Sequence, residues 1–302
     1  MKNGTIWQDI NGNDIQAHGG CILFHEGVYY WYGEHKGADN CPRRFQVDAI
    51  GISCYSSTDL LNWKYEGLVF ESNKDDPESM IHYSKVMERP KVLYNSKNRQ
   101  FVLWMHIDRR DYTYAGVGIA VSDSPTGRFT LQKITVPNRC DSRDMTLFKD
   151  TDGSAYLIHS SDWNKTLCIA KLNDGYTDLD GWYVTALIDQ EREAPALFFC
   201  DGMYYMISSG CTGWHPNPAL YAQSPQLMGK WKLINNPCVG EHADKTFLGQ
   251  SSFIFEANGR FYLMLDHWIP HDLKHSGYSI LPISFSEQKD LVVYWQDEWI
   301  GI

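Results

Sequence analysis

The fold is decided by the stretch HGGCILFHEGVYYWYGE (18–34), which begins at a polar residue, enters an apolar strand, turns at Glu26-Gly27 and leaves through an aromatic strand. This pattern is typical of a β-hairpin. Four more segments repeat it: ERPKVLYNSKNRQFVLWMH (88–106), RDMTLFKDTDGSAYLIHSS (143–161), EAPALFFCDGMYYMISSG (193–210) and GQSSFIFEANGRFYLMLDHW (249–268). Five copies of one hairpin in a single chain indicate a repeat architecture.

A second, looser pair of extended runs follows each hairpin. It is clear at 50–70, 117–133 and 219–234, and weaker at 167–183 and 278–295. Two hairpins form a four-stranded antiparallel sheet, and a spacing of about 50 to 70 residues suits propeller blades better than solenoid repeats. No sustained helical periodicity is present, so few helices are expected.

We therefore predict an all-β chain, a five-bladed β-propeller that occupies residues 1–302 as a single domain. A β-sandwich or another all-β fold is the alternative, but a sandwich does not require a hairpin to recur five times. A strand near Trp7 could close the ring by pairing into the last blade, a point that the sequence leaves open.

The charge and hydropathy of the chain exclude several partners. Twenty-seven basic residues stand against 37 acidic ones, which gives a net charge of -10 without a block of Lys or Arg. Nucleic acid and anionic membrane are therefore poor partners. The sequence has neither a secretory leader pattern nor an 18-residue apolar run, so we expect a cytoplasmic protein, while a trimmed secreted chain remains the alternative. We also expect the protein to be a monomer.

Eight cysteines are scattered along the chain without CxxC pairs or zinc-finger spacing. Several of them, Cys168 and Cys200 among them, lie within apolar strand-like runs. We interpret most of them as buried free thiols, which favours a reducing compartment over a disulfide framework.

In a propeller the innermost strands run along the central axis, so their first residues converge at one end of the channel. These residues are His18, Glu88, Asp144, Glu193 and Gln250. Carboxylates held close together raise one another's pKa, which is typical of a catalytic site. Hydrolysis of a glycosidic bond needs such a set: a protonated carboxylic acid and, in the inverting mode, a second group about 6.5–9.5 Å away to activate water.

Each of these residues also has a structural interpretation. Glu88 precedes Arg89 and Asp144 follows Arg143, so either carboxylate could belong to an ion pair that pins neighbouring blades. Glu193 leads into an apolar strand and is the better candidate for the acid. His18, before two glycines, could satisfy backbone groups or contact a substrate or metal.

Several motifs together resemble glycoside hydrolase family 43, most closely its exo-β-1,3-galactanase branch, subfamily 24. They run in order over about residues 6 to 268: HGG with YYWYGE, SCYSSTDLLNW, ERPKVLYN, MHID, SRDMTLFKDTDG, EAPALF, CTGWHPN and GQSSF. The resemblance implies a five-bladed propeller that inverts the anomeric centre. It also implies release of galactose from the non-reducing end of β-1,3-galactan, the backbone of arabinogalactan.

The resemblance assigns roles to four residues. Glu193 would be the general acid, Asp144 would hold the pKa of that acid and orient it, and Glu88 would bind sugar hydroxyls. Gln250 takes the place of the base. A carboxamide has no readily protonated site at neutral pH. Gln250 must therefore act as its imidic-acid tautomer, as the resemblance suggests, or relay the proton.

The first blade of this chain lacks an acid at its inner strand start. That stretch reads Ala17-His18-Gly19-Gly20, where the family in general uses an aspartate base. This absence separates the chain from the arabinofuranosidase and xylosidase members of the family.

Further contacts to the sugar are expected around the pocket, since aromatic faces stack on the apolar face of galactose. The candidates in loops after inner hairpins are Tyr114, Thr212 and Trp214. Trp31 and Glu34 end the first hairpin. Most other aromatic residues should form the cores of the blades.

No cofactor or transition metal is expected. The histidines His267, His271 and His275 are spaced by four, but Pro270 argues against one continuous helix through them. Relatives in the family carry a calcium or another ion in the channel, so a structural calcium near His267 stays open.

Two other functions remain possible on the same fold. One is a β-galactosidase, or another exo-glycosidase, that acts on short oligosaccharides. The other is a glycan-binding propeller without hydrolysis, in which Gln250 marks a lost base. The presence of Glu193, Asp144 and Glu88 argues against the second alternative, because a binding module needs no acid with a tuned pKa.

Overall fold

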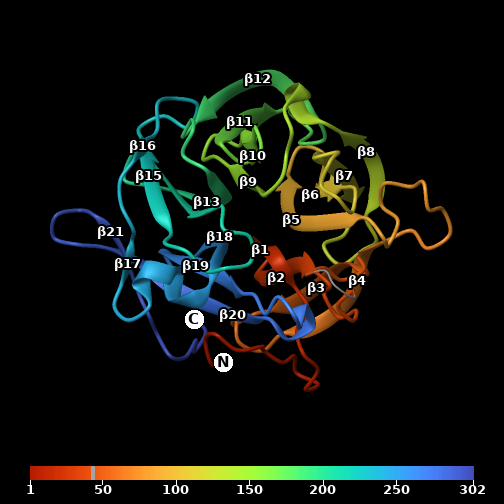
Figure 1. Cartoon of the computed structure of the whole chain (residues 1–302), viewed down its shortest axis with the longest axis horizontal. Coiled ribbons are helices and arrows are strands. Elements are labelled where there is room, and N and C mark those ends of the chain that lie inside the picture. Colours follow the sequence, from red (N-terminus) through yellow and green to blue (C-terminus); the bar gives the residue numbers. More distant parts are fainter. Residues whose placement is uncertain (42–44) are drawn as a thin grey trace.

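The computed structural model describes residues 1–41 and 45–302, and its strands form five antiparallel sheets around a central axis (Figure 1). Each sheet is built from a contiguous stretch of chain, and its first strand lies innermost. The prediction of a five-bladed β-propeller is confirmed. Helical structure in the described residues is limited to three short 3-10 turns, at Pro137–Arg139, Ala243–Leu248 and Leu273–His275.

The blades follow one another in sequence order. Blade 1 contains β1 (His18–His25), β2 (Val28–Glu34), β3 (Gly51–Ser57) and β4 (Lys64–Glu71). Blade 2 contains β5 (Val86–Asn95), β6 (Gln100–Asp108), β7 (Gly116–Ser122) and β8 (Thr130–Thr135). Blade 3 contains β9 (Met145–Lys149), β10 (Ala155–Ser161), β11 (Thr166–Leu172) and β12 (Leu179–Ala186).

Blade 4 contains β13 (Arg192–Cys200), β14 (Met203–Gly210), β15 (Leu220–Ser224) and β16 (Lys232–Leu233). Blade 5 contains β18 (Gln250–Ala257), β19 (Arg260–His267), β20 (Gly277–Phe285) and β21 (Leu291–Tyr294). The short strand β17 (Cys238–Val239) pairs in parallel with β21 and extends this last sheet. The outer hairpins expected after each inner hairpin are therefore present in all five blades.

The inner strands share an irregularity close to the end where they begin. Register shifts occur at His18/Cys21, Glu88/Lys91, Glu193/Ala196 and Ser251/Phe253. A β-bulge of this kind bends the strand and re-aims the side chains beside it. Arg89 and Ala194 lie in the bulges with φ of 53° and 51°, a strained conformation that costs about 1–3 kcal/mol for a residue other than glycine. These strand tips are thus shaped for a purpose other than sheet pairing.

Glycine is required at the first of these bulges. Gly19 has a φ of 55°, and a Cβ atom at this position would lie 2.2 Å from Oε1 of Glu34. Replacement of Gly19 by any larger residue would push the Glu34 carboxylate out of its place beside the channel.

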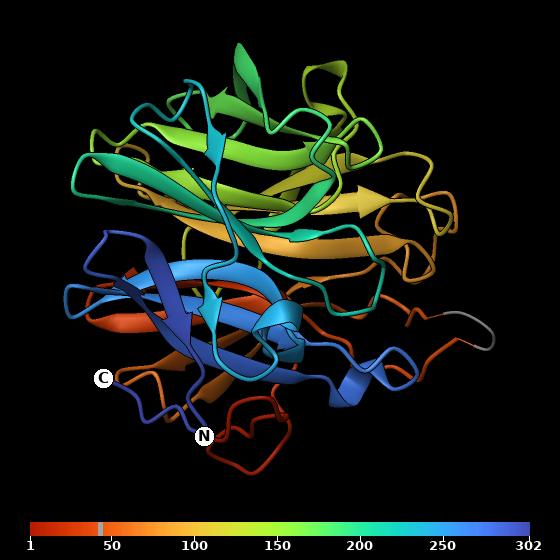
Figure 2. The same cartoon turned by 60° about the vertical axis from the view of Figure 1, so that its left-hand side comes forward.

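The N-terminal segment joins blade 1 to blade 5, as the position of Trp7 suggested. Isolated bridges link Thr5 to Tyr278 of β20 and Lys2 to Glu298, so the contact is a pair of bridges and not a full strand. The two termini lie side by side (Figures 1 and 2), and the N-terminal ammonium donates a hydrogen bond to the backbone carbonyl of Trp299 at 2.7 Å.

The ring of Trp7 is the apolar part of this closure. It is 2% exposed and contacts the rings of Trp31 and Tyr278, with centroids 6.0 and 5.8 Å away. Blades 1 and 5 therefore meet through a shared aromatic core, to which the N-terminal segment contributes one of the largest side chains.

Substitution of Trp7 by alanine should lower the free energy of unfolding by about 3–5 kcal/mol, because it removes a buried indole from this core. Denaturant unfolding followed by fluorescence or circular dichroism measures the change. Trp182→Ala is the matched control, because the Trp182 side chain is 74% exposed and its loss should leave stability nearly unchanged. Equal stability of the two variants would contradict the role of Trp7 in closing the ring.

Candidate active site

A cavity of about 330 Å³ opens at the end of the channel where the inner strands begin. Its volume falls within the range of small-ligand sites. Its walls carry four carboxylates together with basic, amide and aromatic side chains: Glu34, Lys36, Glu88, Arg89, His106, Tyr112, Arg143, Asp144, Asn164, Glu193, Gly213, Trp214, Gln250 and Trp268. Four of the five predicted strand-start residues therefore meet here, namely Glu88, Asp144, Glu193 and Gln250.

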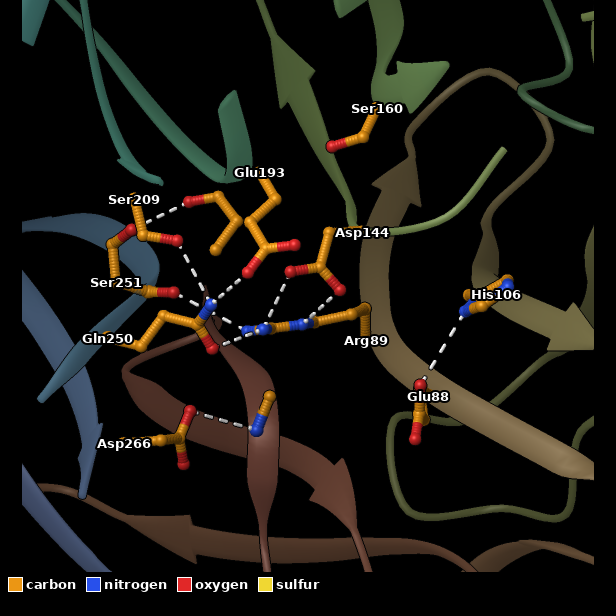
Figure 3. A network of polar contacts seen from close by, with 12 residues as sticks. Glu88, Arg89, His106, Asp144, Ser160, Glu193, Ser209, Gln250, Ser251 and Asp266 are labelled. Atoms are coloured by element: carbon orange, nitrogen blue, oxygen red, sulfur yellow. Dashed lines mark hydrogen bonds and ion pairs between the residues drawn. The ribbon is translucent and has the colours of Figure 1, made fainter. Parts of the chain in front are cut away.

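The guanidinium group of Arg89 lies at the centre of the site (Figure 3). Its Nε and Nη2 donate to the two carboxylate oxygens of Asp144, at 2.9 and 2.8 Å. Nη2 also donates to the side-chain oxygen of Gln250 at 2.7 Å. Because Arg89 is in blade 2, Asp144 begins blade 3 and Gln250 begins blade 5, one buried cation ties three blades together.

An ion pair that pins neighbouring blades, left open by the sequence, is thus present with a different partner. Asp144 pairs with Arg89 from the preceding blade, and its sequence neighbour Arg143 pairs with Asp141 instead. The same carboxylate can serve both purposes, because a structural ion pair also fixes the charge that faces Glu193.

Glu193 has the properties of a general acid. Burial, reinforced by the negative charge of Asp144, raises the pKa of its carboxyl to about 8. Arg89 acts in the opposite direction but does not cancel these effects. Oε1 accepts a hydrogen bond from Nε2 of Gln250 at 3.1 Å, and Oε2 accepts one from Nδ2 of Asn164 at 3.3 Å. At neutral pH this carboxyl group holds a proton that it can donate.

The amide of Gln250 is held in one orientation. Its oxygen accepts hydrogen bonds from Arg89 and from Nε1 of Trp268, at 2.7 and 3.0 Å, and both partners can only donate. Its nitrogen donates to Glu193 and to Oγ of Ser209, at 3.1 and 3.0 Å. In the neutral imidic acid the side-chain oxygen of Gln250 carries a proton. That proton would point at Arg89 and Trp268, which are both donors, so this tautomer can form only if one of these two hydrogen bonds opens.

The contact between Gln250 and Glu193 is also shorter than an inverting reaction needs. About 6.5–9.5 Å must separate the acid from the group that activates water. A bound sugar and its attacking water would therefore have to part the two side chains.

Glu88 is an ionised carboxylate on the opposite wall. Although burial favours the neutral acid, Lys36 and His106 together lower the pKa of Glu88 to about 2. Lys36 lies 3.5 Å from Oε1, and the Tyr112 hydroxyl donates to the same oxygen at 3.1 Å. A fixed anion of this kind accepts hydrogen bonds from sugar hydroxyls.

His106 is the charged partner of Glu88 in this wall. Although burial favours its neutral form, the hydrogen bond to Asp108 and the negative charge of Glu88, 3.7 Å from Nδ1, raise the pKa of His106 to about 9. Asp108 accepts the hydrogen bond from Nε2 of His106 at 3.1 Å. The imidazolium therefore keeps Glu88 ionised over the neutral pH range.

Comparison with known proteins identifies the family to which this chain belongs. The family described as "Glycosyl hydrolases family 43" matches residues 21–280. The chain belongs to glycoside hydrolase family 43. Enzymes of this family need no cofactor for catalysis. A search of curated proteins finds no match.

Solved structures of family 43 enzymes are similar over almost the whole chain. A β-1,3-galactosidase solved with galactodeoxynojirimycin is 39% identical, with a TM-score of 0.92 over 99% of both chains. An exo-β-1,3-galactanase from Phanerochaete chrysosporium, solved with galactose, is 32% identical, with a TM-score of 0.88 over 97% of this chain and 66% of that one. An exo-β-1,3-galactanase from Clostridium thermocellum is 34% identical, with a TM-score of 0.86 over 98% and 65%. The present chain thus spans about two thirds of these two galactanase chains.

Four of the seven residues expected to bind substrate do not line the cavity of this family 43 enzyme: His18, Trp31, Tyr114 and Thr212. His18 is fully buried, and its ring nitrogens face Asp266 Oδ1 at 3.2 Å and the Tyr278 hydroxyl at 3.0 Å. His18 therefore lies outside the cavity lining, where its ring contacts Asp266 and Tyr278 at the base of the strand tips. Trp31 is also fully buried, in the aromatic core with Trp7, because its side chain points to the face of β2 opposite Glu34.

The loop residues divide in the same way. Trp214 lines the cavity and packs edge-on against Trp268, with ring centroids 5.4 Å apart. Thr212 lies outside the cavity lining, where its hydroxyl braces its own loop through His215 and Asn217. Tyr114 packs over Gly116, and Tyr112, two residues earlier, takes the place beside the sugar site.

Glu34 does line the cavity, as expected from its place at the end of the first hairpin. It is 3% exposed, accepts the backbone N–H of Arg89 at 3.0 Å and pairs with Lys36 at 2.6 Å. Glu34 therefore forms part of the floor, where it holds the bulge that carries Arg89.

Sequence reasoning did not identify several residues of the site: Lys36, Arg89, His106, Tyr112, Asn164, Ser209 and Trp268. Some left a signal. His106 and Ser209 lie near the ends of second strands, directly across from strand starts that were identified, because Glu88 pairs with His106 and Glu193 pairs with Ser209. Strand pairing in a hairpin could have pointed to both positions.

A calcium ion takes six to eight oxygen ligands, and a structural calcium near His267 stays a prediction. Burial lowers the pKa of His267 to about 4, and its Nε2 is 2.7 Å from Oγ of Ser279. Within 1–41 and 45–302, no group of three or more His, Cys, Asp or Glu side chains could hold a metal. In the same ranges no helix has the length and apolar character needed to span a bilayer.

A carbon-13 NMR titration of labelled glutamate should give a midpoint of about 8 for the Glu193 carboxyl, assigned by its loss in Glu193→Gln. Asp144→Asn should move this midpoint to lower pH, because it removes a nearby negative charge and leaves Arg89 without its partner. The neutral acid would then persist over a narrower range of pH. A midpoint near 4.5 in both proteins would contradict the assignment of Glu193 as the acid.

Proposed function

We propose that this family 43 enzyme is an exo-acting, inverting hydrolase that releases galactose from the non-reducing end of β-1,3-galactan. The observation that carries the proposal is the buried Glu193 carboxyl beside the Arg89–Asp144–Gln250 cluster in a pocket at the channel end, where burial raises its pKa. The similarity to β-1,3-galactosidases and exo-β-1,3-galactanases supports the choice of sugar and linkage.

In the proposed reaction Glu193 donates its proton to the glycosidic oxygen as the bond to the anomeric carbon breaks. Water attacks that carbon from the opposite face, and its proton passes toward Gln250. The bond between Gln250 and Glu193 in the substrate-free enzyme then offers a path by which the proton returns to the acid. The overall change is one water consumed and two sugars with free hydroxyl groups formed.

The other polar groups would position the sugar and the charges. Asp144 keeps the pKa of Glu193 high, and Glu88 accepts hydrogen bonds from galactose hydroxyls. Arg89 and Trp268 both donate to the Gln250 oxygen, so they hold the amide with its nitrogen toward Glu193 and Ser209.

A second candidate is an enzyme of the same chemistry that acts on short β-1,3-linked galacto-oligosaccharides. It is favoured by the 39% identity to a β-1,3-galactosidase that matches over 99% of both chains.

All eight cysteines lie in the described parts of the chain and are free thiols, four of them buried. This supports our proposal that the enzyme works in a reducing compartment.

Sugar release from β-1,3-galactobiose and from β-1,3-galactan tests the proposal, with arabinan and arabinoxylan fragments as comparison substrates. The wild type should release galactose from the β-1,3-galactosides alone, and proton NMR should detect the α-anomer first. Equal rates on polymer and disaccharide favour the galactanase, and activity confined to short chains favours the second candidate.

Glu193→Gln and Gln250→Ala should each lower kcat by about 10²- to 10⁴-fold, because each removes a proton-transferring group. Galactose binding, measured by calorimetry, should persist in Glu193→Gln. A wild type that binds galactan but releases no sugar would instead identify a glycan-binding module, and full activity of Gln250→Ala would remove this residue from the mechanism.

A further inference from the structure

The loop between β10 and β11 presents an exposed tryptophan beside the active site. Trp163 is 69% exposed, although large aromatic side chains are normally covered. Its neighbour Asn164 lines the cavity and donates to Glu193. The same short loop therefore carries a bare indole ring and a residue that contacts the general acid.

The loop is held in a fixed and unfavourable conformation. The Asp141 carboxylate accepts the backbone N–H groups of Asp162 and Trp163 at 2.7 and 3.0 Å. It also accepts the Ser161 hydroxyl at 2.9 Å. Asp162, Trp163 and Asn164 have φ of 50°, 53° and 66°, three left-handed residues in a row. Backbone strain of this kind is typical of functional loops, and a bulky aromatic residue is unusual in it.

One face of the indole ring is covered by a residue of the cavity wall. The Cζ atom of Arg143 lies 4.3 Å from the ring centroid, and Arg143 lines the cavity. The guanidinium group is itself held by Asp141. The cation–π contact fixes the orientation of the ring, and the rest of the side chain is exposed to solvent.

The position of this ring relative to Glu193 indicates what it could bind. The general acid donates its proton to the oxygen of the leaving group, so the leaving group lies on the side of the acid that faces outward. Oε1 of Glu193 faces Gln250 within the cluster, and Oε2 faces Asn164 of the Trp163 loop. A sugar attached to the scissile oxygen would pass along this loop as it leaves the cavity.

We propose that Trp163, oriented by Arg143, is the stacking platform for the leaving-group sugar. This proposal rests on the proposed function and extends it to a second, neighbouring sugar site. The ligand is a pyranose that presents its C–H face to the exposed side of the indole. The competing explanation is that Trp163 only shields the Arg143–Asp141 ion pair, in which case its loss would affect stability and all substrates alike.

Trp163→Ala separates these explanations through substrates that differ in the leaving group. On β-1,3-galactotriose and β-1,3-galactobiose we expect kcat/KM to fall by about tenfold, the loss that one aromatic stacking contact would cause. On β-galactosyl fluoride, whose leaving group is too small to reach the ring, kcat/KM should stay within about twofold of the wild type. Trp163→Tyr, which keeps an aromatic face, should recover most of the activity on the oligosaccharides.

Two controls complete the experiment. Trp182→Ala removes a similarly exposed tryptophan from the outer strand β12 and should leave kcat/KM unchanged on both the oligosaccharides and the fluoride. In a Glu193→Gln background, calorimetry should show that Trp163→Ala weakens binding of galactotriose by about tenfold and leaves binding of galactose unchanged.

Equal losses on the fluoride and the oligosaccharides, or no loss on either, would overturn the platform while the hydrolase activity of the wild type stands. A wild type that neither binds nor cleaves the oligosaccharides would overturn the proposed function as well, so the two failures can be told apart.

Discussion

The site depends on one buried ion pair. Arg89 and Asp144 come from adjacent blades, and their two-point contact fixes a positive and a negative charge at the channel mouth. The positive charge anchors the oxygen of Gln250, while the negative charge helps to keep the proton on Glu193. Burying two charges is costly unless geometry is good and further hydrogen bonds are made, and both conditions are met here. The same ion pair also positions Gln250 and Glu193, the groups proposed to transfer protons.

The two walls of the pocket are kept in opposite charge states by their surroundings. Glu193 is buried near another carboxylate and stays neutral near pH 7, whereas Glu88 is buried among Lys36, His106 and Tyr112 and stays ionised. Two glutamates at equivalent strand starts thus perform different tasks. The difference is set by their neighbours and not by their position in the fold, a pattern seen wherever paired carboxyl groups divide acid and anion roles.

The architecture was predictable from the sequence because each blade begins with the same hairpin pattern, and strand-start positions then indicated Glu88, Asp144, Glu193 and Gln250. What could not be predicted are the contacts between blades. The partner of Asp144 proved to be Arg89 and not its neighbour Arg143, since Arg143 is paired with Asp141. Trp31 was expected at the pocket, but successive side chains of a strand point to opposite faces of the sheet, and the sequence does not show which face meets the cavity. The Trp31 ring is buried in the core.

The bulges at the strand tips have a further consequence. Three of the affected hairpins carry an active-site group at the irregularity, namely Glu88, Glu193 and Gln250, while the regular ladder behind it only has to pack against the next blade. A hairpin is therefore a self-contained module for exchange. Chimeras that swap whole hairpins between family members could alter a single catalytic group while the remaining four blades keep their pairing, which makes the blade the natural unit of recombination in this enzyme.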